Sequence, residues 1–133
     1  MNYIALICTA VLGLLLFGLG FLVSALRGKY DTLMGHPLEP AHLLQKAVRA
    51  HGNTAEFAPF FAVLFLYLGA HQPSTVVLWT IGIATLSRVL IVVGLLTCAT
   101  LARPHPVRFL GALGTYITGI ILSIALVAQY TGS

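Results

Sequence analysis

Four long apolar stretches, at residues 3–26, 43–70, 75–101 and 107–130, take up most of this 133-residue chain. A transmembrane helix needs about 20 predominantly apolar residues to cross a bilayer, and each stretch is long enough. Only 8% of the residues are charged, whereas a soluble domain usually has about 25%. We therefore expect an all-α integral membrane protein, a four-transmembrane-helix bundle that forms one domain over residues 1–133.

The first stretch is either a signal peptide or a retained helix. Its apolar part is long for a signal peptide, no basic segment precedes it, and no Ala-x-Ala-like cleavage site follows it. We interpret it as a retained helix.

The basic residues are distributed unevenly between the connections. The second connection and both termini contain no Lys or Arg. Because cytoplasmic loops of membrane proteins are enriched in these residues, we expect loops 27–42 and 102–107 to be cytoplasmic and both termini to face outward. Six of the seven basic residues lie in or beside those two loops: Arg27, Lys29, Lys46, Arg49, Arg103 and Arg108.

Several functional classes fit the composition poorly. The net charge of +4 comes without a basic cluster, which argues against nucleic-acid binding. Cys8 and Cys98 lie in apolar segments without further ligands at suitable spacing, so we expect no metal site. We interpret both as packing residues, although a disulfide between them stays open. Four spans without an inverted repeat offer little for alternating access in a transporter.

Among the polar side chains in the first half of the second apolar stretch, three have a regular spacing: Arg49, Asn53 and Glu56. Spacings of four and three residues stack them on one face of a helix. Ionisable groups at the centre of a membrane helix cost about 2.5–3.5 kcal/mol each on insertion scales, and they are tolerated where they face a bundle interior or a polar cavity. This face is therefore the candidate site.

Further arginines are expected at the same membrane layer, because Arg27 ends the first helix, Arg88 lies in the second half of the third, and Arg108 begins the fourth. Two uses of these charges compete. Glu56 either neutralises Arg88 or Arg49 structurally, since buried charges need partners, or it accepts a ligand's ammonium group while the arginines bind its carboxylates. One carboxylate cannot neutralise all these arginines, which favours a ligand.

The segment Arg49-Ala-His-Gly-Asn53-Thr-Ala-Glu56-Phe57-Ala-Pro59 resembles the helix-two signature of the MAPEG family, the membrane-associated proteins in eicosanoid and glutathione metabolism. The pattern Arg-x-x-x-Asn-x-x-Glu-[aromatic]-x-Pro at the start of a membrane helix is specific. The chain length and the four expected spans fit as well. The His-Gly-Asn version is similar to the small bacterial inner-membrane branch, which includes YecN-like proteins.

The resemblance implies a homotrimer in a bacterial inner membrane, with both termini periplasmic. It also implies that glutathione is bound between neighbouring subunits near the cytoplasmic face. A cation beside a thiol lowers the pKa of that thiol and raises the thiolate fraction, which is the role that the resemblance implies for the catalytic arginine. The matching residues are Arg27, Arg49, Asn53, Glu56 and Arg88 for glutathione binding and Arg108 for catalysis.

Ile91 and Leu95 depart from the family pattern. Well-characterised enzymes of the family carry Tyr or His at the first position and Tyr at the second, and prostaglandin E synthase has Ser where this chain has Phe109. Ile91 and Leu95 cannot form hydrogen bonds to a ligand, which argues against an eicosanoid activity. We expect a glutathione-dependent transferase or peroxidase that acts on lipophilic electrophiles from the bilayer. The alternative is a non-catalytic protein of the same fold that keeps the ligand pocket.

Overall fold

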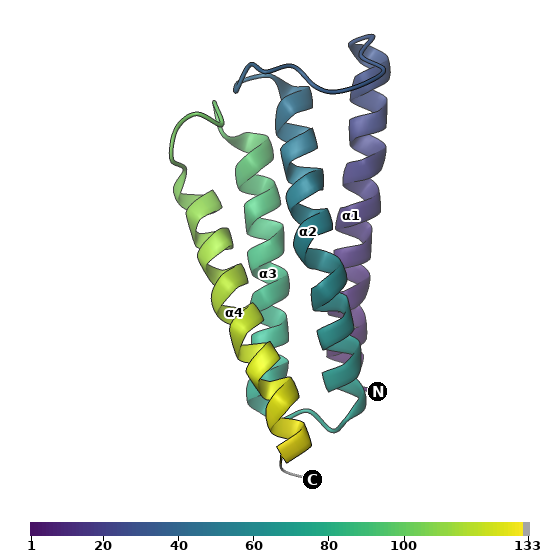
Figure 1. Cartoon of the computed structure of the whole chain (residues 1–133), viewed down its shortest axis with the longest axis vertical. Coiled ribbons are helices and arrows are strands. Elements are labelled where there is room, and N and C mark those ends of the chain that lie inside the picture. The colour runs from purple at the N-terminus through teal and green to yellow at the C-terminus, as the bar shows by residue number, and fades with distance from the viewer. Residues whose placement is uncertain (132–133) are drawn as a thin grey trace.

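The computed structural model describes residues 1–131, except for the side chain of Tyr130, and within them the chain forms four helices (Figure 1). Each helix is long and apolar enough to cross a membrane, so the expected four-helix membrane fold is confirmed. The predicted domain runs to residue 133, but residues 132 and 133 lie outside the described part. The helices are α1 (Tyr3–Lys29), α2 (Leu43–Ala70), α3 (Thr75–Thr97) and α4 (Pro106–Thr131).

The helix α3 is shorter than the apolar stretch that predicts it. It ends at Thr97 rather than at residue 101, and Cys98 is extended. The Leu101 amide donates to the Pro40 carbonyl at 2.9 Å. This bond joins the α3–α4 loop to the α1–α2 loop and takes the amide that would otherwise continue the helix.

The helices pack as two pairs joined through α3. α1 packs mainly against α2 and α4 against α3, and α3 also contacts α1 and α2. α2 and α4 meet over a short length, whereas α1 and α4 are not in contact within the described residues.

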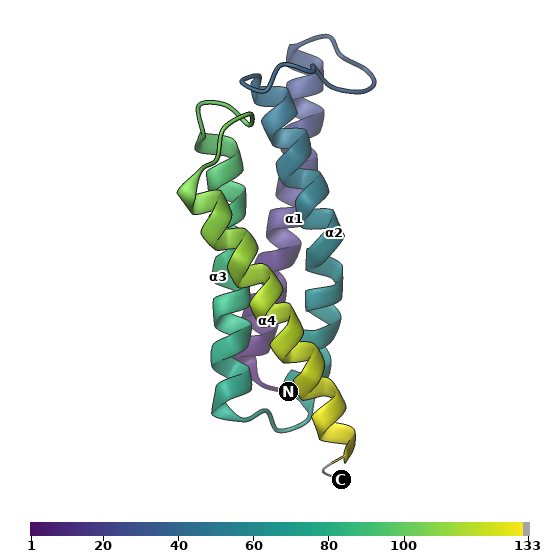
Figure 2. The ribbon, with the colours of Figure 1, turned by 60° about the vertical axis from the view of Figure 1, so that its left-hand side comes forward.

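The two ends of the bundle differ in what they carry. The loops at residues 30–42 and 98–105 lie at one end, and the N-terminus, the end of α4 and the loop at residues 71–74 lie at the other (Figures 1 and 2). We call the first the basic end, because it holds the loops beside which six of the seven basic residues lie. We call the second the terminal end.

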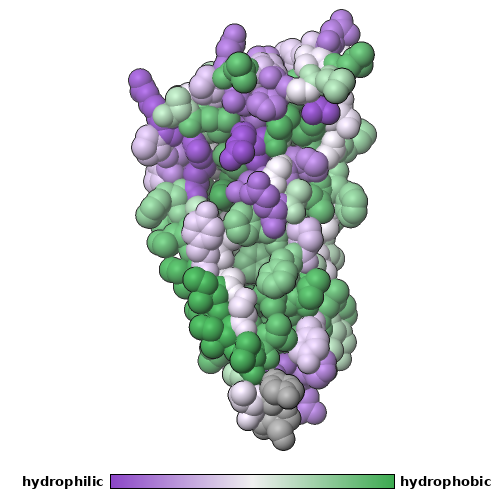
Figure 3. Space-filling view, viewed as in Figure 1, coloured by the Kyte–Doolittle hydropathy of each residue, from purple (hydrophilic) through white to green (hydrophobic). Residues whose placement is uncertain are grey.

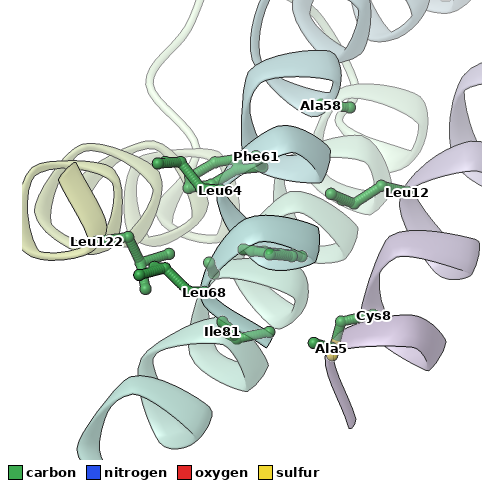
Figure 4. Packing of buried hydrophobic residues seen from close by; sticks show 11 residues of the cluster. Ala5, Cys8, Leu12, Ala58, Phe61, Leu64, Leu68, Ile81 and Leu122 are labelled. Atoms are coloured by element: carbon green, nitrogen blue, oxygen red, sulfur yellow. The ribbon is translucent and has the colours of Figure 1, made fainter. Parts of the chain in front are cut away.

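The core nearer the terminal end is apolar and closely packed (Figure 4). Leu12 of α1, Phe65 of α2, Ile81 of α3 and Leu122 of α4 are at most 1% exposed. In a bilayer such contacts stabilise mainly through van der Waals packing, because lipid tails are as apolar as leucine. The packed core holds the four helices in place beside the polar layer.

The seam between α3 and α4 depends on a small residue. A Cβ on Gly111 would lie 2.6 Å from the amide nitrogen of Ile91, so a larger residue does not fit unless the helices move apart. Small residues at such positions let membrane helices approach closely. One turn further along α4, this close approach places Thr115 beside Arg88 of α3.

Candidate functional site

The polar stripe, which we define as Arg49, Asn53 and Glu56, begins near the basic end of α2 and reaches the middle of the helix. α2 has 28 residues, which corresponds to about 42 Å at 1.5 Å per residue, and Glu56 lies halfway along it. Arg49 and Glu56 are exposed on the chain, and Asn53 is half-buried. On the face shown in Figure 3, hydrophilic side chains gather in the half nearer the basic end, above a largely hydrophobic half. A carboxylate therefore faces outward from the middle of a membrane span.

Arg88 of α3 lies behind the polar stripe and is 0% exposed. Its Nη2 donates to Oδ1 of Asn53 at 2.6 Å and to the carbonyl oxygen of Asn53 at 3.0 Å. Its Nη1 donates to Oγ1 of Thr115 in α4 at 3.4 Å. One buried guanidinium thus connects α2, α3 and α4.

An aromatic ring completes the surroundings of this guanidinium. The Arg88 Cζ lies 5.1 Å from the ring centroid of Phe57, within the range of cation–π attraction. The Phe57 ring lies 5.9 Å from the ring of Tyr116 in α4. These two rings form a second contact between α2 and α4, next to the polar stripe.

Neutral groups, rather than a carboxylate, accept from Nη1 and Nη2 of Arg88, and its Nε is buried without a partner. The charge of Glu56 acts on Arg88 from a distance, but no ion pair within 4.0 Å occurs among residues 1–131. The structural interpretation, in which Glu56 neutralises Arg88 or Arg49, therefore has no direct contact to support it in this chain. The carboxylate of Glu56 remains free to accept from another group.

Arg27 lies at the last turn of α1 and is held by the loop that follows. It is half-buried, its Nη2 donates to the carbonyl of Gly35 at 3.4 Å, and its Nε is buried without a partner. Gly35 has a φ of +69°, a conformation that glycine adopts without steric cost. Within the described residues no hydrogen bond connects Arg27 to the polar stripe.

Arg108 lies in the first turn of α4 and is held by the α3–α4 loop. It is half-buried, and its Nη1 donates to the carbonyls of Leu101 at 3.4 Å and Arg103 at 3.3 Å. Of the residues expected at the site, Asn53 and Arg88 are connected by direct hydrogen bonds. No hydrogen bond of the described residues joins Arg108 to the stripe.

Ile91 and Leu95 face the interior of the bundle. They are 7% and 6% exposed, and they belong to a buried apolar cluster with Leu19 of α1 and Ala50 of α2. The two residues that differ from the family pattern therefore lie in the bundle interior behind the polar stripe. There they provide apolar packing instead of hydrogen-bonding groups.

An open groove of about 1050 Å³ extends from Glu56 toward the terminal end, between α2 and α4. Its volume is at the upper limit of the pockets that hold small molecules in proteins. Glu56 is the one ionisable carboxylate among its lining residues within the described chain, so a charged group stands at the end of an apolar surface. The other lining residues include Phe57, Phe60, Tyr116, Ile120 and Ile124.

A comparison with models of protein families matches residues 5–128 to the model described as MAPEG family. The match covers nearly the whole chain. The chain belongs to the MAPEG family. Comparisons with curated proteins and with solved structures give no significant match. Membership of the MAPEG family makes the chain, in general terms, a glutathione-related integral membrane protein.

Two residues of this MAPEG site were not singled out by the sequence. Thr115 accepts from Arg88, and Tyr116 lies beside Phe57 and lines the groove. The available signal was the position of Thr115 seven residues after Arg108, which places both on one face of α4. That spacing alone does not say which helix the face meets.

Replacing Thr115 by Val should destabilise the protein by about 1–2 kcal/mol, because Nη1 of Arg88 loses its acceptor. Thr118→Val is a matched control. Both hydroxyls donate within α4, at 2.7 Å to the carbonyl of Gly111 and 2.6 Å to that of Gly114, but only Thr115 also accepts from Arg88. Thermal unfolding in detergent measures the difference, and equal melting temperatures of the two variants would show that the contact contributes nothing.

Proposed function

We propose that the protein binds glutathione at the polar stripe and uses the glutathione thiolate in a transferase or peroxidase reaction on lipophilic electrophiles. The observation that carries the proposal is the exposed charge at the middle of a membrane span. Arg49 and Glu56 have no ion-pair partner among residues 1–131. Such groups are costly in hydrocarbon unless a cavity or a partner receives them, and a polar ligand at this level removes that cost.

The chemical groups of glutathione match the side chains on offer. The tripeptide carries two carboxylates, an ammonium group, amides and a thiol. Arg49 can bind a carboxylate through two parallel hydrogen bonds, and Glu56 can accept from the ammonium group. Arg27 has no ion-pair partner within the described residues and is only half-buried, so its guanidinium is available for the second carboxylate.

We propose further that the complete site forms between copies of the chain in a homotrimer. The outer face of α1 presents Leu14, Phe17 and Phe21, each at least 75% exposed, and the groove between α2 and α4 offers an apolar surface beside Glu56. Because these two surfaces differ, their contact is head-to-tail, and such contacts form closed rings when the rotation allows it. A neighbouring copy would then cover the polar stripe and add its own basic residues.

Arg108 is the residue that we propose for catalysis. A guanidinium beside the glutathione thiol, shielded from water, favours the thiolate. In the transferase reaction the thiolate sulfur forms a bond to an electrophilic carbon, and the leaving group departs with its electron pair. In the peroxidase reaction the sulfur attacks a peroxide oxygen and breaks the O–O bond, which gives a glutathione sulfenic acid and, after protonation, an alcohol. A second glutathione then reacts with the sulfenic acid to give glutathione disulfide and water. The lipophilic acceptor would reach the sulfur from the bilayer along the groove between α2 and α4.

The position of the basic residues supports an orientation in a bacterial inner membrane. Six of the seven Lys and Arg lie in or beside the loops at the basic end, and cytoplasmic loops are enriched in these residues. We therefore propose a cytoplasmic basic end and periplasmic termini, which a reporter enzyme fused to the C-terminus would test.

Ile91 and Leu95 favour a second function. Both are buried and apolar, so α3 offers neither a hydroxyl nor an imidazole at these positions. The second candidate is a non-catalytic MAPEG-fold protein that keeps the glutathione pocket without thiol chemistry. It differs from the first in one observable, because it binds glutathione without forming a thiolate.

In mild detergent the protein should form a stable assembly of three 14.2 kDa chains. Phe17→Ala should weaken this assembly, because Phe17 belongs to the proposed contact face of α1. Trp79→Ala is the control, since Trp79 is 70% exposed on α3, outside that face. Native mass spectrometry measures the assembly, and a wild-type protein that stays monomeric would exclude the trimer.

Glu56→Gln should weaken glutathione binding by at least about tenfold, or about 1.4 kcal/mol, because a neutral amide replaces the partner of the ammonium group. The variant should stay folded, since Glu56 has no hydrogen bond or ion pair within the described residues. Isothermal titration calorimetry measures the affinity. Glu39→Gln, which changes an exposed carboxylate in the α1–α2 loop, is the control. If Glu56→Gln does not fold and the wild type does not bind, Glu56 is structural.

Arg108→Ala should abolish the absorbance of bound thiolate near the ultraviolet edge, together with any transferase activity, and should reduce affinity less. Arg108→Lys should keep part of both signals, because it keeps the charge and loses the planar fork. Arg103→Ala, which changes an exposed arginine of the loop before α4, is the control. Wild-type protein that binds glutathione without thiolate at any pH would leave only the non-catalytic function.

A further inference from the structure

We infer that Arg88 is a positioning residue that orients the side-chain amide of Asn53, so that the Asn53 NH₂ group donates to an acceptor oxygen of the ligand. The inference rests on the proposed function, and it gives the site a defined order of hydrogen-bond donors and acceptors.

The orientation of the amide follows from the chemistry of the guanidinium. Arginine has five N–H donors and no acceptor, whereas the two ends of an asparagine amide differ. The atom of Asn53 that lies 2.6 Å from Nη2 of Arg88 must therefore be the oxygen. The nitrogen of the same amide then points away from Arg88.

The guanidinium has little freedom to turn. Arg88 is 0% exposed, and Nη2 is held by two oxygens of the same residue, the side-chain and backbone oxygens of Asn53. Thr115 accepts from Nη1 at 3.4 Å, and the Phe57 ring centroid lies 5.1 Å from Cζ. Contacts from α2 and α4 thus hold the cation in a single orientation.

The free end of the amide is available to a ligand. Nδ2 of Asn53 has no hydrogen-bond partner among residues 1–131, and it is not one of the buried atoms that lack a partner. It therefore reaches the surface on the side of the polar stripe. An amide held by one end and free at the other is preorganised, so the ligand does not bear the entropic cost of ordering it.

The polar stripe then has a fixed order of hydrogen-bonding groups. From the basic end toward the middle of the span, Arg49 donates, Asn53 donates and Glu56 accepts. A ligand that fits this order presents oxygen acceptors to the first two and an ammonium group to the third. A zwitterionic amino-acid group has this polarity, because it carries a carboxylate beside an ammonium group.

The test compares Asn53→Asp with Asn53→Leu. A carboxylate at residue 53 keeps an acceptor for Arg88 and removes the NH₂ donor, whereas Leu removes both. Asn53→Asp should therefore melt within a few degrees of the wild type and bind glutathione at least tenfold more weakly. Asn53→Leu should melt clearly lower, because the guanidinium loses its side-chain acceptor. Gln45→Glu, which adds a negative charge to α2 one turn before Arg49, is the charge control.

Changes at Arg88 provide a second readout that adds no charge to the stripe. Arg88→Lys keeps a cationic donor and should keep most of the affinity for glutathione. Arg88→Gln offers both a donor and an acceptor, so Asn53 can turn over, and the affinity should fall at least fivefold. A purely structural Arg88 would instead lower the melting temperatures without this difference in affinity.

Three results would overturn the inference: wild-type affinity in Asn53→Asp, an equal loss of affinity in Gln45→Glu, or a melting temperature of Asn53→Asp as low as that of Asn53→Leu. A wild-type protein that does not bind glutathione removes the proposed function instead. In that case the melting temperatures of the two Asn53 variants still decide whether the amide oxygen faces Arg88.

Discussion

Arg88 is fully buried inside a membrane helix, and a guanidinium keeps its charge at any pH that a protein normally meets. The protein itself must therefore solvate the cation. It does so with the two oxygens of Asn53, the hydroxyl of Thr115 and the ring of Phe57, while Nε is left without a partner. Because these groups come from α2 and α4, the requirement also fixes how the two helices meet α3. A shift of α2 by one residue would turn Asn53 away from the cation.

The close packing of α4 on α3 makes this solvation possible. Gly111 lets the two backbones approach so closely that a Cβ would lie 2.6 Å from the Ile91 amide nitrogen, and Thr115 follows one turn later. Toward the terminal end the same helix and α2 together line the groove below Glu56, and Gln129 near the end of α4 donates to the His71 carbonyl at 3.1 Å. The polar contact and the apolar groove are therefore consequences of a single helix path.

The charges on the outward face of α2 need partners from outside the chain, in contrast to the buried Arg88. Glu56 is exposed at the middle of a membrane span and Arg49 is exposed nearer the basic end, and hydrocarbon is a poor environment for either charge. Asn53 connects the buried and the exposed charges, because its side-chain oxygen accepts from Arg88 and its side-chain nitrogen faces the polar stripe. Asn53 and Thr115 supply hydrogen-bond acceptors for the buried cation. A ligand, a neighbouring copy of the chain, or both would supply partners for the exposed charges.

The sequence by itself determined the four membrane helices and the polar stripe, because hydropathy and helical periodicity depend on residues that are close along the chain. It also indicated the MAPEG family through the motif that begins at Arg49. Only the tertiary structure decided that α3 ends at Thr97, that Thr115 rather than Glu56 contacts Arg88, and that loop carbonyls hold Arg108. These outcomes depend on which helices meet, at what depth and in which rotation, and the spacing of residues within one helix contains none of that information.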